Sequence, residues 1–193
     1  MDSLTDIDGV LVSQRIFRTV METFAHPFRI YNIKDGMPEN ETTIKELCFV
    51  FLDNAVSFHV HGDHGDLRLT EEIREMTYAR PASLEKADFV IVKDIRAFDS
   101  YENLCQGSLV DPHKGATVIF DVPGIGGEEK IVAEGPGING KIIRFVDKNI
   151  ADCLCRTAKL DMEYPKGFEI IFACPKGDIL AVPRHTRIFR EVV

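Results

Sequence analysis

The sequence predicts an α/β fold in which helices cover the faces of a mixed β-sheet. Apolar residues recur at three- and four-residue spacings over 13–25, a pattern typical of an amphipathic helix. Residues 88–92 form a short apolar segment rich in β-branched side chains, which favours a buried strand. After residue 105, extended apolar segments are separated by turns rich in glycine and proline, which indicates hairpins.

The N-terminal half is expected to alternate helices with strands. Pro27 and Pro81 end two of the helices, because proline cannot continue the backbone hydrogen bonding. In chain order we expect a helix from Ser13, its N-cap, to Ala25; a half-buried strand over 28–33; a helix over 42–52; a strand over 55–61; a helix over 70–79; a buried strand over 88–92; and a helix over 97–105.

The C-terminal half is expected to contain two hairpins around one helix. Segments 116–122 and 130–134 read as an antiparallel pair joined by a turn, and a helix is expected within 147–160. We expect segments 168–173 and 179–182 to form the final hairpin and the tail over 187–193 to add an edge strand. No repeat, linker or low-complexity tract divides the chain, so we expect one domain over residues 1–193.

Charge and composition exclude several function classes. The chain has 193 residues, with 23 basic and 31 acidic side chains and a formal charge of −8, and no run of Lys or Arg. Nucleic acids and anionic membranes require clustered positive charge, so neither is an expected partner. The acidic N-terminus does not resemble a secretory signal, and no apolar stretch approaches the roughly 20 residues that cross a bilayer. We therefore expect a cytoplasmic protein. Its five cysteines contain no CxxC pair and argue against a disulfide framework.

A histidine cluster raises the hypothesis of a zinc hydrolase. His59, His61, Asp63 and His64 follow the HxHxDH order of metallo-β-lactamase-type hydrolases. A strand ending in His59-Val-His61 points both imidazoles to the same side, and a turn could return His64 toward them as a third nitrogen ligand. Asp63 would then activate water. The alternative interpretation is a solvated loop between a strand and a helix, which we favour, because the chain lacks the further ligands that such a hydrolase requires.

A glycine-rich segment and a pair of cysteines also suggest chemistry. Residues 135–140 satisfy GxGxxG, but the extended residues 142–146 follow them, whereas a phosphate-binding loop requires a helix there. A turn is the better interpretation. Cys153 and Cys155 lie in an expected helix, where side chains two apart face different directions and cannot chelate one ion together.

Several longer segments resemble the PhnH family, a subunit of the bacterial carbon-phosphorus lyase core complex in phosphonate breakdown. Phe17-Arg18, Met21, Ala25 and Pro27 look like the family's FRxxMxxxAxPG segment, with Phe28 where glycine is usual. Three further segments match in order: Gly107-Ser-Leu-Val-Asp-Pro112-His-Lys-Gly115-Ala-Thr117, Gly135-Pro-Gly-Ile138, and Tyr164-Pro-Lys-Gly167. Leu180-Ala-Val-Pro183-Arg184-His185-Thr186 is similar to ALPRTT, with His185 in place of the first Thr.

The resemblance implies a three-layer α/β sandwich related to pyridoxal-phosphate-dependent transferases, but without the cofactor. It also implies a homodimer that assembles with PhnG, PhnI and PhnJ subunits. That complex forms the triphosphate of ribose 1-methylphosphonate from ATP and a phosphonate, with the nucleoside chemistry mainly in PhnI and the radical cleavage in PhnJ. By this resemblance the chain is a noncatalytic subunit, with no cofactor and no activity expected alone.

Arg184 and Thr186 are the candidate binding residues. An arginine that directly follows a buried strand can present its planar fork to a phosphate or to a partner's carboxylate. A structural salt bridge within the chain is the alternative interpretation. No catalytic residue is predicted, and the hypothesis of an independent zinc hydrolase rests on the histidine cluster alone.

Overall fold

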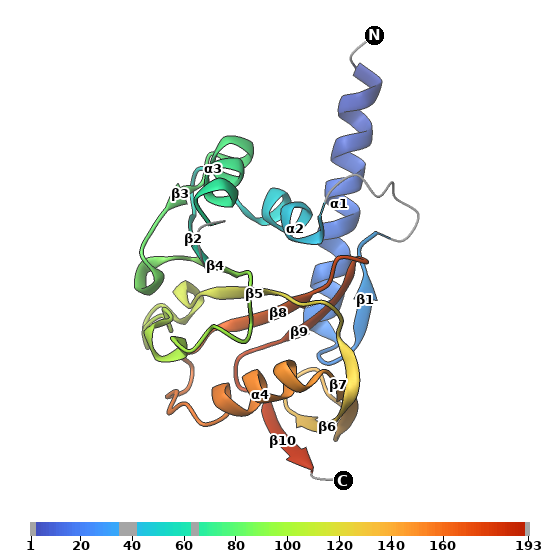
Figure 1. Ribbon diagram of the computed structural model, residues 1–193, viewed down its shortest axis with the longest axis vertical. Coiled ribbons are helices and arrows are strands. Elements are labelled where there is room, and N and C mark those ends of the chain that lie inside the picture. The colour runs from blue at the N-terminus through green and yellow to red at the C-terminus, as the bar shows by residue number, and fades with distance from the viewer. Residues whose placement is uncertain (1–2, 35–41, 63–65, 192–193) are drawn as a thin grey trace.

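A seven-stranded mixed sheet forms the centre of the computed structural model, which describes residues 3–34, 42–62 and 66–191 (Figure 1). Strand β9 runs antiparallel to its two neighbours, and every other neighbouring pair is parallel. The strand order across the sheet is β1 (Ile30–Asn32), β9 (Asp178–Val182), β8 (Glu169–Ala173), β5 (Thr117–Asp121), β4 (Phe89–Val92), β2 (Ser57–His61) and β3 (Arg80–Pro81). The predicted mixed sheet is therefore confirmed.

Three helices cover one face of this sheet: α1 (Ser3–Ala25), α2 (Thr43–Phe51) and α3 (Asp66–Thr77). They pack through apolar side chains on a core that includes alternate residues of the inner strands. Its buried members are Ile16, Val20, Ile33, Ile44, Leu47, Cys48, Leu52, Phe58, Val60, Ile73, Ala79, Ile91, Ile119, Ile171, Ala173 and Ile179. The N-terminal half of α1 extends beyond the rest of the molecule (Figure 1).

The other face is covered by helix α4 (Lys148–Thr157) and a second, three-stranded sheet. That sheet is antiparallel, with β6 (Gly126–Glu134) between β10 (Arg187–Glu191) and β7 (Ile142–Val146). Short 3-10 helices η1 (Leu84–Lys86), η2 (Tyr101–Asn103) and η3 (Pro112–Lys114) complete the connections. The result is three layers, with the central sheet between the two coverings.

Local signals in the sequence placed several elements correctly. Thr42 caps α2 by accepting a hydrogen bond from the backbone of Lys45, and Asp147 caps α4 by accepting one from Asn149. The final hairpin is confirmed, because β8 and β9 pair antiparallel with Ile170 opposite Val182. The tail forms β10, which is an edge strand, but of the second sheet.

One predicted pairing is wrong. We expected 116–122 and 130–134 to form a hairpin, but β5 and β6 lie in different sheets. Strand β5 is inserted between β4 and β8, with Val118 and Phe120 buried on one face and Ile119 on the other. Burial on both faces is typical of an inner parallel strand, whereas β6 turns back on β7. Adjacency along the chain was therefore a poor guide to pairing here.

Other predicted boundaries also need correction. Helix α1 begins ten residues before Ser13, whose hydroxyl donates to the carbonyl of Gly9 at 2.9 Å and does not cap the helix. Helix α3 begins at Asp66, one turn before Thr70. The expected helix over 97–105 is reduced to the single 3-10 turn η2. The expected strand over 28–33 keeps only the three residues of β1, because Phe28 has a positive φ of 62°.

Candidate functional site

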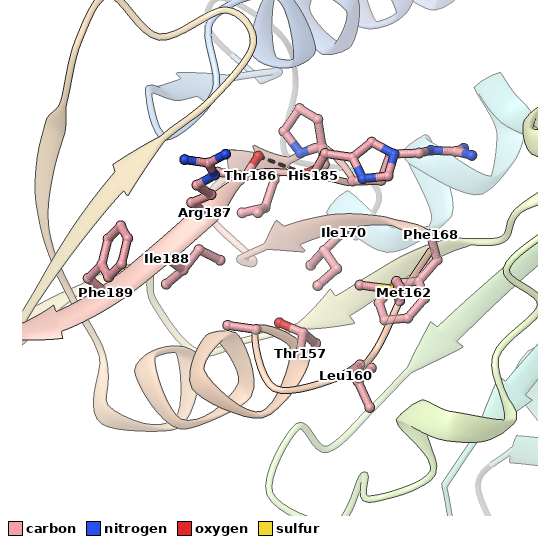
Figure 2. Close-up of a pocket in the computed structure, with 14 residues that line it drawn as sticks. Thr157, Leu160, Met162, Phe168, Ile170, His185, Thr186, Arg187, Ile188 and Phe189 are labelled. Atoms are coloured by element: carbon pink, nitrogen blue, oxygen red, sulfur yellow. Dashed lines mark hydrogen bonds between the residues drawn. The ribbon is translucent and has the colours of Figure 1, made fainter. Parts of the chain in front are cut away.

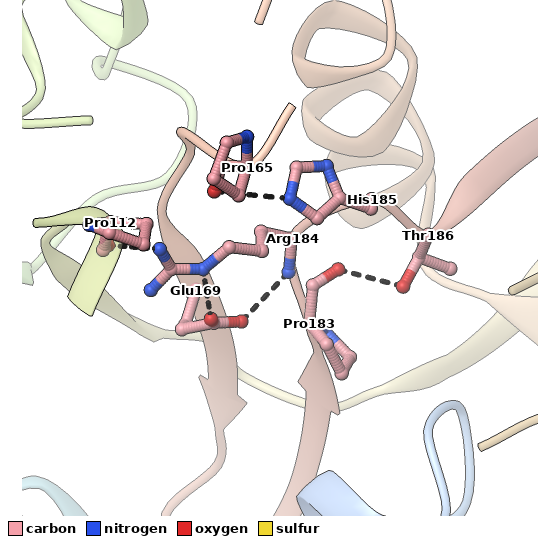
Figure 3. Close-up of polar contacts among 7 residues, drawn as sticks. All are labelled: Pro112, Pro165, Glu169, Pro183, Arg184, His185 and Thr186. Atoms are coloured by element: carbon pink, nitrogen blue, oxygen red, sulfur yellow. Dashed lines mark hydrogen bonds and ion pairs between the residues drawn. The ribbon is translucent and has the colours of Figure 1, made fainter. Parts of the chain in front are cut away.

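Arg184 lies at the end of β9, where it joins three segments that are distant in the sequence (Figure 3). Its Nε–H donates to Oε1 of Glu169 at 2.5 Å, and its backbone N–H donates to the other carboxylate oxygen at 2.7 Å. Its Nη1 donates to the carbonyl of Pro112. Both charged side chains are largely buried, with 17% exposure for Arg184 and 21% for Glu169. The guanidinium therefore serves as a bridge inside the chain, as a structural salt bridge would.

Two glycines permit the close approach on which this bridge depends. A Cβ on Gly115 would lie 2.0 Å from the carbonyl oxygen of Gly167 and 3.2 Å from Nη1 of Arg184. Gly167 has a positive φ of 147°, and a Cβ there would lie 3.1 Å from Cβ of Arg184. No side chain fits between these backbones. We call Pro112, Gly115, Gly167, Glu169 and Arg184 the arginine junction.

A second junction joins the end of α1 to the turn between β6 and β7. A Cβ on Gly137 would lie 2.7 Å from Cδ of Pro27 and 2.9 Å from the carbonyl oxygen of Ala25. Beside it, Phe28 has a positive φ, although it is not glycine, and its side chain is fully buried. Nε of Arg144 donates to the carbonyl of Phe28 at 2.9 Å. Burial of the phenyl ring and this hydrogen bond hold the left-handed conformation.

Thr186, the other candidate binding residue, is used within the turn after β9 (Figure 3). Its backbone N–H and its hydroxyl both donate to the carbonyl of Pro183, at 3.2 and 2.7 Å. Between them, His185 has a positive φ of 68°, and its Nε2–H donates to the carbonyl of Pro165 at 3.3 Å. The turn therefore fixes the start of β10. The predicted role of Arg184 and Thr186 as contacts for an anion or a partner stays a prediction.

A hollow of about 530 Å³ lies beside these turns, between the C-terminal end of α4 and β10 (Figure 2). In Figure 2, the side chains of Ile170 and Ile188 lie between β10 and the end of α4, whereas Arg187 lies on the opposite side of β10. The lining residues are Thr157, Ala158, Leu160, Met162, Phe168, Ile170, Val182, Pro183, Arg184, His185, Thr186, Arg187, Ile188 and Phe189. None of these is acidic, so the hollow suits an apolar group better than a cation.

The histidine cluster is only partly within the described residues. His59 and His61 lie on the same side of β2, as predicted, with ring centroids 6.1 Å apart. The Nδ1–H of His59 donates to the carbonyl of Ala82 at 3.0 Å, and His61 packs edge-on against Phe98. Asp63 and His64 lie outside the described residues. Within the described ranges, no three His, Cys, Asp or Glu side chains are grouped to hold a metal ion.

The glycine-rich segment forms a turn, as favoured from the sequence. Residues 135–140 connect β6 to β7, so a strand and not a helix follows them. Without a helix N-terminus facing the glycines, this segment lacks the geometry of a phosphate-binding loop. Cys153 is buried in α4, and burial raises the pKa of its thiol to about 12. Cys155 is more exposed, in agreement with side chains that face different directions.

Some residues of these junctions escaped the sequence analysis. Nothing in the sequence indicates that Arg184 bonds the carbonyl of Pro112, because a backbone acceptor carries no side-chain signal. The sequence did contain a signal for the positive φ of Phe28. Glycine is usual at this position in the family that the chain resembles, and glycine adopts positive φ without strain.

Comparisons with known proteins identify similarity over most of the chain. Residues 6–189 match the family model described as "Bacterial phosphonate metabolism protein (PhnH)". The chain is also 26% identical over 175 residues to the "Putative C-P lyase subunit protein HtxG" of Stutzerimonas stutzeri. That match covers 91% of this chain and 85% of the relative.

Proposed function

The chain belongs to the PhnH family of phosphonate-metabolism proteins, and on that basis we propose that it is a noncatalytic subunit of a carbon-phosphorus lyase core complex. The observation that carries the proposal is the match over residues 6–189, which includes residues of both described sheets and of α1, α2, α3 and α4. It is supported by the relative whose name describes it as a subunit.

The geometry of the family segments supports a structural role for this chain. The charged and hydroxyl groups that the sequence singled out bond to other groups of the same chain: Arg184 to Glu169 and Pro112, and Thr186 to Pro183. Internal hydrogen bonds of this kind hold the three segments together, as expected of a structural role. We therefore propose that the segments shared with the family preserve a docking shape.

The partners that the family resemblance implies are PhnG, PhnI and PhnJ subunits, together with a second copy of this chain. We propose that the complex acts in the cytoplasm and forms ribose 1-methylphosphonate 5-triphosphate from ATP and a phosphonate. The other subunits carry out the chemistry. We also propose a fold relationship to pyridoxal-phosphate-dependent transferases. A mostly parallel sheet with β9 alone antiparallel, covered on both faces, supports that relationship. No described helix has the length and apolar character needed to span a membrane.

Co-purification tests the proposal. The tagged chain is coexpressed with PhnG, PhnI and PhnJ subunits and recovered through its tag, with the untagged chain as the control for background binding. We expect the three subunits in fixed ratio to the tagged chain after size-exclusion chromatography. Recovery of the tagged chain without them, with normal circular dichroism and cooperative melting, would overturn the proposal.

A further inference from the structure

The two sheets have four edge strands in the described part of the chain, and they differ in how they are protected. Proteins usually blunt exposed edges with charges, proline or very short strands, because a bare edge pairs with another chain. Strand β1 has three residues, β3 has two and includes Pro81, and β10 carries Arg187, Arg190 and Glu191. Strand β7 has five residues, Ile-Ile-Arg-Phe-Val, with one charge.

That single charge does not protect the edge. Arg144 is held by its hydrogen bond to the carbonyl of Phe28, within its own chain. Its neighbours Ile143 and Phe145 point the other way and are 53% and 51% exposed. Backbone pairing of β7 is with β6, and no other backbone hydrogen bond joins residues 142–146 to a described residue. The second edge of β7 is therefore both apolar and open.

An apolar row continues from this edge across the second sheet. Val132 lies opposite both Phe189 and Ile143, so these three side chains share the face that is turned away from the core. Val132 is only 5% exposed, yet it belongs to neither core cluster, so its neighbours on this face cover it. We call Val132, Ile143, Phe145 and Phe189 the outer face.

Two ion pairs flank the outer face, and in each of them a lysine is paired with a glutamate of the same chain. Lys141 contacts Glu134 at 2.7 Å on one side, and Lys130 contacts Glu191 at 2.7 Å on the other. An incoming chain therefore meets an apolar strip between compensated charges. A second copy of the same strip fits it without leaving a new unpaired charge.

We propose that β7 pairs antiparallel with β7 of a second copy of this chain, with Ile143 opposite the partner's Ile143. Pairing centred on Arg144 would place two guanidiniums opposite each other, which is unfavourable. Pairing centred on Phe145 would place Ile143 opposite the partner's Asp147. Centred on Ile143, the pairing sets Phe145 against the partner's Lys141, a favourable cation–π arrangement, and sets Arg144 against the partner's Ile142.

This register joins the two three-stranded sheets into one sheet of six strands. The apolar row then runs from Phe189 through Val132 and Ile143 into the same three residues of the second copy. The inference deepens the proposed self-association by naming its surface, and it does not depend on the proposed role in phosphonate metabolism.

Substitution of the central residue is the first arm of the test. Ile143→Lys places two like charges opposite each other at the two-fold, and we expect the dimer dissociation constant to rise at least about 100-fold. The measurement is sedimentation velocity over a concentration series. Leu109→Lys is the matched control, because Leu109 is 56% exposed and lies outside both sheets. Unchanged far-UV circular dichroism and cooperative unfolding of both variants show that the fold is retained.

Disulfide trapping is the second arm and tests the register. Residues directly opposite in an antiparallel pair have Cα atoms about 4.5–5.5 Å apart, which suits a disulfide. Ile143→Cys should therefore give a covalent dimer under mild oxidation. Phe145→Cys should not, because its copies would lie roughly 14 Å apart along the strands. The chain without substitution is the control, because it shows whether its own cysteines form a covalent dimer under the same oxidation.

The outcomes distinguish failure of the proposed β7 interface from failure of self-association itself. Dissociation by Ile143→Lys with selective trapping at 143 supports the proposal. A dimer that survives Ile143→Lys, or trapping at 145 as fast as at 143, overturns the β7 surface but leaves self-association intact. A chain that is monomeric at every concentration, or that pairs through β7 only with another subunit, overturns both.

Discussion

The arginine junction and the outer face are opposites in chemistry and in use. In the arginine junction, charged groups are largely buried and bonded to one another, and two glycines leave no room for a side chain. On the outer face, the side chains of Ile143, Phe145 and Phe189 are about half-exposed. Residues that attract attention in the sequence by their chemistry therefore build the shape. Residues that look like ordinary strand positions are available to a partner.

Enlarging a glycine of the arginine junction should have the largest effect. Gly115→Ala puts a Cβ 2.0 Å from a backbone oxygen that cannot move without shifting β8. We expect a loss of about 4 kcal/mol or more in the free energy of unfolding, measured by urea denaturation. Gly124→Ala is the control, because a Cβ there meets nothing within 4 Å. Equal stability of the two variants would contradict the close packing.

Removing the guanidinium should have the next largest effect. Arg184→Ala leaves the Glu169 carboxylate and the Pro112 carbonyl without their side-chain donor, and we expect a loss of about 2–3 kcal/mol. Arg184→Lys should recover less than half, because an ammonium does not present the planar fork that reaches both acceptors. Full recovery by lysine would show that charge alone matters. Chemical denaturation of the three proteins measures this.

On the outer face, the same kind of change should leave stability almost untouched. Phe145→Ser replaces a half-exposed ring, and we expect a change below about 0.5 kcal/mol in the free energy of unfolding at a protein concentration at which the chain is monomeric. Its effect should appear in the concentration dependence of the dimer. A loss of stability as large as that of Arg184→Ala would erase the distinction between the two regions.

Metal removal should have the smallest effect. His59 and His61 have a carbonyl and an aromatic ring as neighbours, and the described residues supply no third ligand for them. We expect dialysis against EDTA to shift the melting midpoint by less than about 1 °C, because the described residues group no set of ligands through which a metal could stabilise the fold. Stoichiometric zinc that is lost in His59→Ala would instead favour the zinc hydrolase.

Local patterns predicted much of the fold, and long-range pairing was the point of failure. Thr42 and Asp147 carry their capping signals in the sequence, and the hairpin of β8 and β9 encloses a short turn. The separation of β5 from β6 was not visible, because an apolar strand followed by a turn has the same pattern whichever sheet it enters.

The candidate site divides along the same line. Arg184 was identifiable from its position after a strand, but its acceptor on Pro112 is 72 residues away and is a backbone carbonyl. The outer face was not predicted, because the exposure of Ile143 and Phe145 follows from the position of β7 at the edge of the second sheet. The sequence pattern alone does not give that position.

Adenine release from ATP in the presence of methylphosphonate tests the central claim most directly. The purified chain is assayed alone and then with PhnG, PhnI and PhnJ subunits. We expect no release above background from the chain alone, and release from the subunits that increases when the chain is added. Sustained release by the isolated chain, in proportion to its concentration and free of the other subunits, would contradict a noncatalytic role.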